Sequence, residues 1–230
     1  MINTVLWDID GTLLDFFASE KVSIQHCLKA IGAPHDDAVA ARYSRINDAH
    51  WKMLERGEID RHGVNVGRFE VLFAELGLQV DCEAFHKSYQ NKLADTWFFY
   101  PDAIETLKAL KAQGIRQYAV TNGNTPVQKR KLAGSGLADL LDGVFISEEM
   151  GAAKPDKAFF DAVFAALPAA ERVSTVIIGD SPSADIRGGN NANIRTVWFN
   201  PRGEQLPDHV KVWQEITALH QVPALVMGEK

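Results

Sequence analysis

From residue 101 onward the sequence alternates between short apolar stretches and amphipathic segments, and this alternation constrains the fold more than any other feature of the chain. Stretches rich in Val, Ile and aromatic residues are predicted as strands over residues 117–120, 144–147, 175–178 and 195–199. Segments with helical periodicity lie between them. Strands that alternate with helices form a parallel sheet covered on both faces. The sequence therefore predicts an α/β fold.

A helical insertion interrupts this pattern. Val5, Leu6 and Trp7 read as a first strand, but the next predicted strand comes more than a hundred residues later. The chain between them has amphipathic segments bounded by Gly, Pro and Asp, over residues 19–31, 36–56, 60–76 and 81–96. Four antiparallel helices of this length form a compact module. We therefore expect a Rossmann-like parallel sheet core over residues 1–14 and 99–230, with an inserted helical cap over residues 15–98.

Two local patterns complete the predicted core. Asp102 and Glu105 have the spacing of a capping box, which would open a helix that runs through Lys111. After Phe199 the periodicity is lost, and the remaining chain is predicted to be an irregular tail.

Composition narrows the class of protein. The net charge of −6 and the pI of about 5.6 argue against a nucleic-acid-binding surface. No apolar run approaches the roughly 18 residues of a membrane span, and the first ten residues do not resemble a secretory signal. The two cysteines, Cys27 and Cys82, lie far apart and read as packing residues in a reducing environment. We expect a cytoplasmic protein with no membrane or nucleic-acid partner. Nothing in the sequence indicates its oligomeric state.

Polar side chains follow the predicted strands at the points where the strands end. The carboxyl ends of parallel strands meet at one edge of a sheet, so side chains placed there should converge. The residues in these positions are Asp8, Asp10, Thr121, Asn122, Lys154, Asp180 and Asp185.

Each of these residues has a simpler interpretation. Residues 121–123 could form an ordinary turn, and Lys154 could be a solvated side chain before a helix. Asp180 could be the N-cap of the helix after Pro182, and Asp185 could interact with the dipole of that helix. Four such coincidences at one sheet edge are improbable together, so we favour a functional site.

The residue types suit phosphoryl transfer through an aspartyl-phosphate. Asp8 is the candidate nucleophile, and Asp10, two residues later on the same face, is the candidate general acid and base. One Mg²⁺ ion would take carboxylate oxygens from Asp8 and Asp180 and the backbone carbonyl of Asp10. Thr121 and Asn122 would bind the phosphoryl oxygens, and Lys154 would offset the growing negative charge.

These motifs resemble the haloacid dehalogenase superfamily. The four segments DIDGT, TNG, KPD and GDSPSAD occur in the order typical of that superfamily and span the chain. The resemblance implies that Asp8 is the nucleophile, Asp10 the general acid and base, and Asp180 a metal ligand. It also implies that Thr121 and Lys154 are catalytic and that Asp185 is a supporting contact. A helical cap between the first two motifs is similar to the subclass I arrangement.

Further segments look like the pyrimidine 5′-nucleotidase branch. They are ISEEMGAAKPD and TNGN in the core, and WKMLERGEID and GRFE in the cap. The expected substrate is a small phosphorylated metabolite, and within that class a pyrimidine nucleoside monophosphate. Substrate choice is expected to lie in the cap, where Phe16 and Phe17 could stack on a base and Arg68 could hydrogen-bond it. Their alternatives are hinge packing for Phe16 and Phe17 and a solvated helix face for Arg68.

Other functions fit parts of the pattern. A phosphosugar phosphatase or mutase would use the same motifs. A 2-haloacid dehalogenase would use Asp8 to displace halide, but it would need neither a metal nor a second acid such as Asp10. A catalytically idle binding module would not need all four motifs.

Overall fold

A parallel six-stranded sheet forms the centre of the fold. The computed structural model describes residues 1–167, 169–208 and 210–228. The strands lie in the order β3-β2-β1-β4-β5-β6, and every neighbouring pair is parallel. Their bounds are β1 Thr4–Trp7, β2 Arg116–Thr121, β3 Gly143–Ile146, β4 Thr175–Gly179, β5 Arg195–Phe199 and β6 Gln214–Ile216. The predicted α/β fold class with a parallel core is confirmed.

The first strand lies in the middle of the sheet. Trp7, its last residue, pairs with Ala119 of β2 and with Ile178 of β4. All four residues of β1 are buried, as expected for a strand covered on both faces and paired on both sides. Residues that follow β1 therefore emerge beside the carboxyl ends of β2 and β4, which places Asp8 at the centre of this edge.

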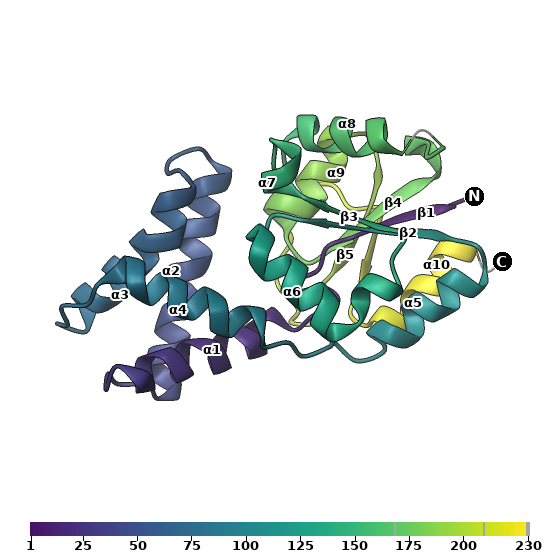
Figure 1. Cartoon of the computed structure of the whole chain (residues 1–230). Coiled ribbons are helices and arrows are strands. Elements are labelled where there is room, and N and C mark those ends of the chain that lie inside the picture. Colours follow the sequence, from purple (N-terminus) through teal and green to yellow (C-terminus); the bar gives the residue numbers. More distant parts are fainter. Residues whose placement is uncertain (168, 209, 229–230) are drawn as a thin grey trace. The chain divides into compact units, whose positions relative to one another are not determined.

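Helices cover both faces of the sheet (Figure 1). The helices α5 (Ala103–Ala112), α6 (Thr125–Ser135) and α10 (Val222–Met227) lie on one face, and α8 (Lys157–Ala166) and α9 (Arg187–Asn191) lie on the other. A short helix, α7 (Ser147–Met150), follows β3. Phe159 and Phe160 of α8 pack in one buried cluster with Leu6 of β1 and Ile177 of β4. This apolar layer holds the strand ends in place.

The second unit is helical. The chain divides into two compact units, one of Met1–Asp15 with Phe99–Lys230 and one of Phe16–Phe98. We call them the core unit and the cap unit; Asp15, expected in the cap, belongs to the core unit. The cap unit contains α1 (Phe16–Ala30), α2 (Asp37–Glu55), α3 (Arg68–Glu75) and α4 (Cys82–Ala94), with a π-helical turn, Gly63–Gly67, before α3.

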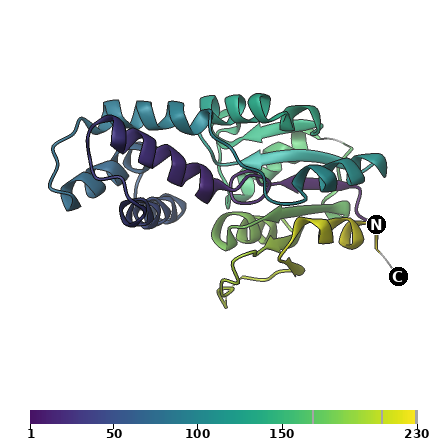
Figure 2. The same ribbon diagram turned by 90° about the horizontal axis from the view of Figure 1, so that it is seen from below.

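Aromatic rings fill the interior of the cap unit. Tyr43 stacks on Phe69 with ring centroids 5.4 Å apart, and Tyr89 meets both rings edge-on. Such pairs add about 0.5–1.5 kcal/mol each beyond their burial. Figure 2 shows α1 and α4 side by side, whereas α2 is viewed nearly along its axis. The cap helices are therefore not all antiparallel as expected, since α2, which carries Tyr43, lies across α1 and α4.

Two local predictions in the core are wrong. Asp102 does not form a capping box, because its backbone is left-handed (φ 64°) and its side chain makes no capping bond. An N-cap side chain reaches its partner from an extended backbone. The Asp102 carboxylate instead lies 3.0 Å from Nδ1 of His220.

The tail after Phe199 is also more regular than expected, since it supplies β6 and α10. The three-residue strand β6 is too short to show an alternating pattern in the sequence. Pairing with β5 defines it, with the Asn200 N–H donating to the Ile216 carbonyl at 2.7 Å. Among the residues that the structure describes, no helix is long and apolar enough to cross a membrane.

Candidate active site

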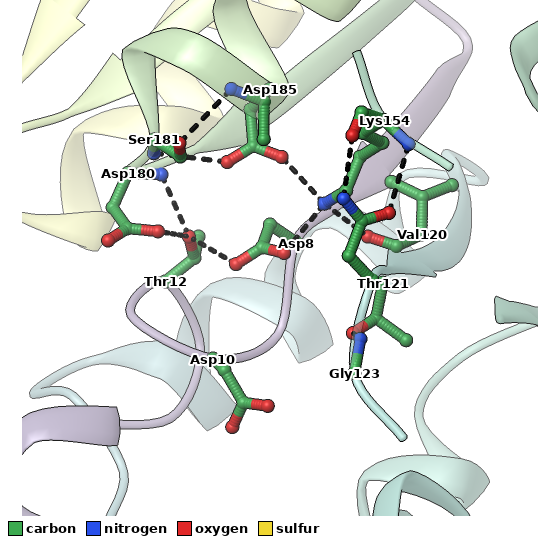
Figure 3. Close-up of polar contacts among 12 residues, drawn as sticks. Asp8, Asp10, Thr12, Val120, Thr121, Gly123, Lys154, Asp180, Ser181 and Asp185 are labelled. Atoms are coloured by element: carbon green, nitrogen blue, oxygen red, sulfur yellow. Dashed lines mark hydrogen bonds and ion pairs between the residues drawn. The ribbon is translucent and has the colours of Figure 1, made fainter. Parts of the chain in front are cut away.

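A buried lysine joins two aspartates at the carboxyl edge of the sheet (Figure 3). Lys154 Nζ donates to Asp8 Oδ1 at 2.7 Å, to Asp185 Oδ1 at 2.6 Å and to the Val120 carbonyl at 2.8 Å. Three acceptors match the three donors of an ammonium group. Lys154 is 3% exposed and Asp8 7%, so these are charge-assisted bonds with little water around them. Lys154 is therefore not the solvated residue that its position alone would allow.

Burial and crowding shift the pKa values of this cluster. Desolvation raises the pKa of Asp8 to about 7; Lys154 opposes the shift and Asp185 adds to it. Desolvation, and then the charges of Asp8 and Asp185, hold the pKa of Asp180 well above its usual range. Burial alone would lower the pKa of Lys154, but Asp185 and Asp8 outweigh it and raise that pKa. Without further positive charge, the cluster resists full ionisation.

Three carboxylates of this cluster fit a divalent cation. Asp8, Asp180 and Asp185 each offer one oxygen, and these atoms lie within 4.8 Å of one another. Fully ionised, they would carry three negative charges against the single ammonium of Lys154, and hard oxygen donors are the set that Mg²⁺ prefers. The donor set thus fits the expected ion. It adds the Asp185 carboxylate to the predicted carboxylates of Asp8 and Asp180.

Thr12 lies between the carboxylates of Asp8 and Asp180. Its hydroxyl lies 3.1 Å from Asp8 Oδ2 and 3.4 Å from Asp180 Oδ1, and it accepts the Asp180 N–H at 3.1 Å. The turn before it requires glycine, because Gly11 has φ +102° and a Cβ there would lie 2.3 Å from Asp180 Oδ2. Thr12 is not among the predicted site residues, although its place as the last residue of DIDGT is a sequence signal for it.

Asp10 lies in a separate environment. Lys131 Nζ donates to Asp10 Oδ1 at 2.7 Å, and Gln128 Nε2 donates to Oδ2 at 2.5 Å. Both donors come from α6 and are almost fully buried. In Figure 3 the Asp10 side chain extends away from the Asp8 carboxylate. Neither donor was predicted, because α6 carries polar residues on its buried side as well as its exposed side, and its sequence does not indicate which of them are buried.

Thr121 and Asn122 lie at the end of β2, but they differ in role. Thr121 is 2% exposed, and its hydroxyl accepts the Gly123 N–H at 3.0 Å. The Asn122 amide bonds to the backbone of Lys154 on both sides, donating to its carbonyl at 2.7 Å and accepting its N–H at 2.9 Å. The side chain of Asn122 thus anchors the segment that carries Lys154, and its contact with a phosphoryl group stays a prediction.

The simpler interpretation of Asp180 does not hold, and that of Asp185 describes only part of its contacts. The N-cap of the turn after β4 is Ser181, whose hydroxyl accepts the Ala184 N–H at 3.1 Å. Asp185 is 1% exposed and accepts the Ser181 N–H at 3.1 Å, besides its bond from Lys154. Gly179 leaves the space for it, because a Cβ there would lie 2.2 Å from the Asp185 carboxyl carbon.

The proposed specificity residues lie in the cap unit. Phe16 and Phe17 begin α1, with rings edge-to-face at 6.2 Å and side chains partly buried. Arg68 is 3% exposed, which excludes a solvated helix face. Its guanidinium donates to Asn47 Oδ1 at 2.6 Å and lies over the rings of Phe69 and Tyr89. This position inside the aromatic cluster does not support direct contact with a base, because the side chain is enclosed.

Comparison with known proteins gives several matches. A model of the haloacid dehalogenase-like hydrolases matches residues 2–193. The pyrimidine 5′-nucleotidase PynA of Streptococcus pneumoniae is 38% identical over 197 residues, covering 86% of this chain and 83% of the relative. The pyrimidine 5′-nucleotidase YjjG of Escherichia coli is 30% identical over 225 residues, covering 96% of each chain.

Solved structures also match. The putative hydrolase YfnB of Bacillus subtilis, in a crystal structure bound to magnesium, superposes with a TM-score of 0.92 at 31% identity, covering 98% of each chain. The L-2-haloacid dehalogenase of Xanthobacter autotrophicus superposes with a TM-score of 0.80 at 18% identity over the full length of both chains, which shows a common fold.

Proposed function

The chain belongs to the haloacid dehalogenase-like hydrolases, and from this membership we propose that it is a phosphomonoesterase acting through an aspartyl-phosphate. The superfamily and the pyrimidine 5′-nucleotidase branch, both read from sequence motifs, are confirmed by these matches. The observation that carries the proposal is the separation of two neighbouring aspartates into different surroundings. Asp8 lies against Lys154, and Asp10 lies against Lys131 and Gln128.

The two aspartates take different roles in the proposed reaction. The Asp8 carboxylate attacks phosphorus while the bond from phosphorus to the ester oxygen breaks, and Asp10 gives that oxygen a proton. Water then attacks the phosphorus of the aspartyl-phosphate and yields a proton to Asp10. The bond between phosphorus and Asp8 breaks, which restores both carboxyl groups. The Thr121 hydroxyl and the N–H groups that follow Asp8 are the proposed donors to the phosphoryl oxygens.

One Mg²⁺ ion per active site completes the proposal. Asp8, Asp180 and Asp185 would hold it, together with the backbone carbonyl of Asp10. Mg²⁺ bound there would neutralise the carboxylates and the phosphate and so lower the repulsion between them. The magnesium in the Bacillus subtilis relative supports this assignment.

For the substrate we propose a pyrimidine nucleoside 5′-monophosphate. The two nucleotidase relatives support this class. The motif residues serve the phosphoryl group, which all phosphomonoesters share, so selection is assigned to the cap unit, with Phe17 as a stacking candidate. For Arg68 we propose a structural role in the interior of the cap unit. Cys27 and Cys82 are free thiols, which supports a location in the reducing cytoplasm.

A panel of substrates tests the proposal. Hydrolysis of p-nitrophenyl phosphate should require Mg²⁺ and stop on chelation. UMP, dUMP and dTMP should then give a higher kcat/KM than AMP, GMP or phosphosugars. A phosphosugar or purine preference would overturn the substrate class alone. Halide release from 2-chloropropionate without phosphatase activity would overturn the reaction, although the dedicated contacts of Asp10 disfavour dehalogenation, which needs no second acid.

A further inference from the structure

We propose that Lys131 and Gln128 are positioning residues that hold the Asp10 carboxylate for proton transfer. This inference rests on the proposed phosphomonoesterase function. It assigns a use to two buried polar side chains that the four sequence motifs do not include.

The contacts define the position of the carboxylate. Lys131 donates to one oxygen of Asp10 at 2.7 Å and Gln128 to the other at 2.5 Å. Two donors on two oxygens set both the place and the plane of the group. A carboxylate has about four acceptor directions, so two of them stay open for a proton to leave or arrive. The same two hydrogen bonds therefore position Asp10 both when it acts as an acid and when it acts as a base.

The helix that carries them is built for this contact. Gln128 and Lys131 are three residues apart and so lie on one face of α6. They are 1% and 0% exposed, between the buried apolar residues Val127 and Leu132. A buried ammonium is unfavourable unless a partner compensates it, whereas an apolar residue would pack there without that cost. A lysine at position 131 therefore indicates a functional role. The negative charge of the Asp10 carboxylate compensates the positive charge of its ammonium.

Gly123 supplies space for the same arrangement. A Cβ on Gly123 would lie 2.1 Å from Gln128 Nε2, the atom that donates to Asp10. The backbone of Gly123 is outside the left-handed region, so its conformation does not demand glycine. The absence of a side chain at Gly123 lets the Gln128 amide pack directly on its backbone, in the position from which it donates to Asp10.

Single-turnover kinetics test the proposal with two substrates of similar shape. Phenyl phosphate has a more basic leaving group than p-nitrophenyl phosphate and depends more on a well-placed acid. Lys131→Met should slow aspartyl-phosphate formation from phenyl phosphate by about 10- to 100-fold, a part of what a general acid contributes. The loss with p-nitrophenyl phosphate should be several-fold smaller, and KM should change little, because neither residue is assigned to substrate. Gln128→Leu should give the same pattern with a smaller loss.

Lys129→Met is the matched control. Lys129 lies on the same helix but is exposed and pairs with Glu149, so this variant should behave as the wild type. In an Asp10→Asn background, Lys131→Met should cause no further loss, because its effect passes through Asp10. Additive losses, or equal losses for both substrates, would overturn the positioning role. If Lys131→Met fails to fold, the same criteria apply to Gln128→Leu. A wild type that forms no phosphoenzyme would instead overturn the proposed function.

Discussion

At the scale of single residues, Asp8 and Asp10 differ in the charged group that each one contacts. Asp8 and Asp10 are two positions apart, yet one contacts Lys154 and the other contacts Lys131. Neighbouring carboxyl groups in different surroundings are the usual basis for separate catalytic roles.

The two aspartates should fail differently when changed. Asp8→Asn removes the proposed nucleophile, so no phosphoenzyme should form. Asp10→Asn keeps the nucleophile and should lower kcat by about 10²–10⁴-fold, the typical contribution of a general acid and base. Rapid quenching with radiolabelled substrate measures both. Trapped phosphoprotein in the Asp8→Asn variant would show that the roles are wrongly assigned.

Magnesium binding should release protons. Because the pKa of Asp8 is raised to about 7 and that of Asp180 is also raised, metal-free protein holds a proton on Asp8 below pH 7 and keeps Asp180 protonated to a higher pH than usual. Mg²⁺ must displace these protons, so its affinity should increase as the pH rises from 6 to 8, with most proton release at the lower pH. Calorimetry in two buffers of different ionisation enthalpy measures the release. Equal affinity across this range would contradict the expectation.

At the scale of elements, turns and helices place the reactive groups. The turn after β1 brings Gly11 against Asp180, and α6 brings Lys131 against Asp10. In the cap unit, α1 and α2 enclose a polar pair in which Asn47 donates to Glu20 at 2.7 Å. Substitutions at Gly11 and Glu20 test the first and the last of these arrangements.

Gly11→Ala should weaken magnesium binding. The added Cβ would collide with the Asp180 carboxylate, and the positive φ would strain alanine by about 1–3 kcal/mol. Gly114→Ala is a matched control, since Gly114 also has positive φ (+75°) but nothing lies within 4 Å of its built Cβ. Both variants should lose stability, and only Gly11→Ala should raise the Mg²⁺ concentration needed for half-maximal activity. Similar magnesium requirements in both variants would argue against the steric account.

Glu20 should make cap stability depend on pH. Burial raises its pKa from 4.5 to about 7, despite hydrogen bonds from Ser44 and Asn47 and the charge of Arg68. The folded state keeps a proton that the unfolded chain loses near pH 4.5. This stabilisation is therefore complete below pH 4.5 and is lost as the pH rises through about 7. Glu20→Gln should remove the dependence and stabilise the protein at pH 8 by roughly 1–3 kcal/mol.

Urea denaturation between pH 4.5 and pH 8 measures this effect. Glu70→Gln, which changes an exposed glutamate of α3, should leave the pH dependence as in the wild type. An unchanged pH profile in Glu20→Gln would show that Glu20 is ionised throughout this range.

At the scale of the whole molecule, the two units have separate interiors. The motif residues belong to the core unit, and the aromatic cluster belongs to the cap unit. The segment that leaves the core unit and the segment that returns to it lie side by side. Leu14 pairs with Phe99, and the Tyr100 N–H donates to the Leu13 carbonyl at 3.1 Å. A short linker can therefore connect residue 15 to residue 99 in place of the cap unit.

Replacing residues 16–98 with such a linker should keep the core folded but remove substrate selection. We expect magnesium binding to persist and the spread of kcat/KM across nucleotides and phosphosugars to narrow to within about tenfold, the equivalent of 1.4 kcal/mol. The substrate panel used for the full chain, with the capless Asp8→Asn variant as a blank, measures this. A capless protein that ranked its substrates as the full chain does would place specificity in the core.

The sequence by itself determined the alternation of strands and helices, the inserted helical segment and the polar residues at the strand ends. These features are legible because period and local residue type are properties of neighbouring positions along the chain. The parallel sheet, and the presence of Asp8, Lys154 and Asp180 at one edge, follow from that pattern. A short strand such as β6, defined only by pairing with β5, has no pattern long enough to detect.

Only the tertiary structure decided which of these groups touch. It assigned Lys131 to Asp10 and Lys154 to Asp8, gave Thr12 its link to Asp180, and turned Asn122 toward the Lys154 backbone. It also enclosed Arg68 among aromatic rings, where a helix surface was expected. The physical reason is that charge pairing and burial depend on distances between residues far apart in the chain. Residue type records that a lysine or an arginine is present, but the surrounding packing decides which carboxylate, ring or solvent it meets.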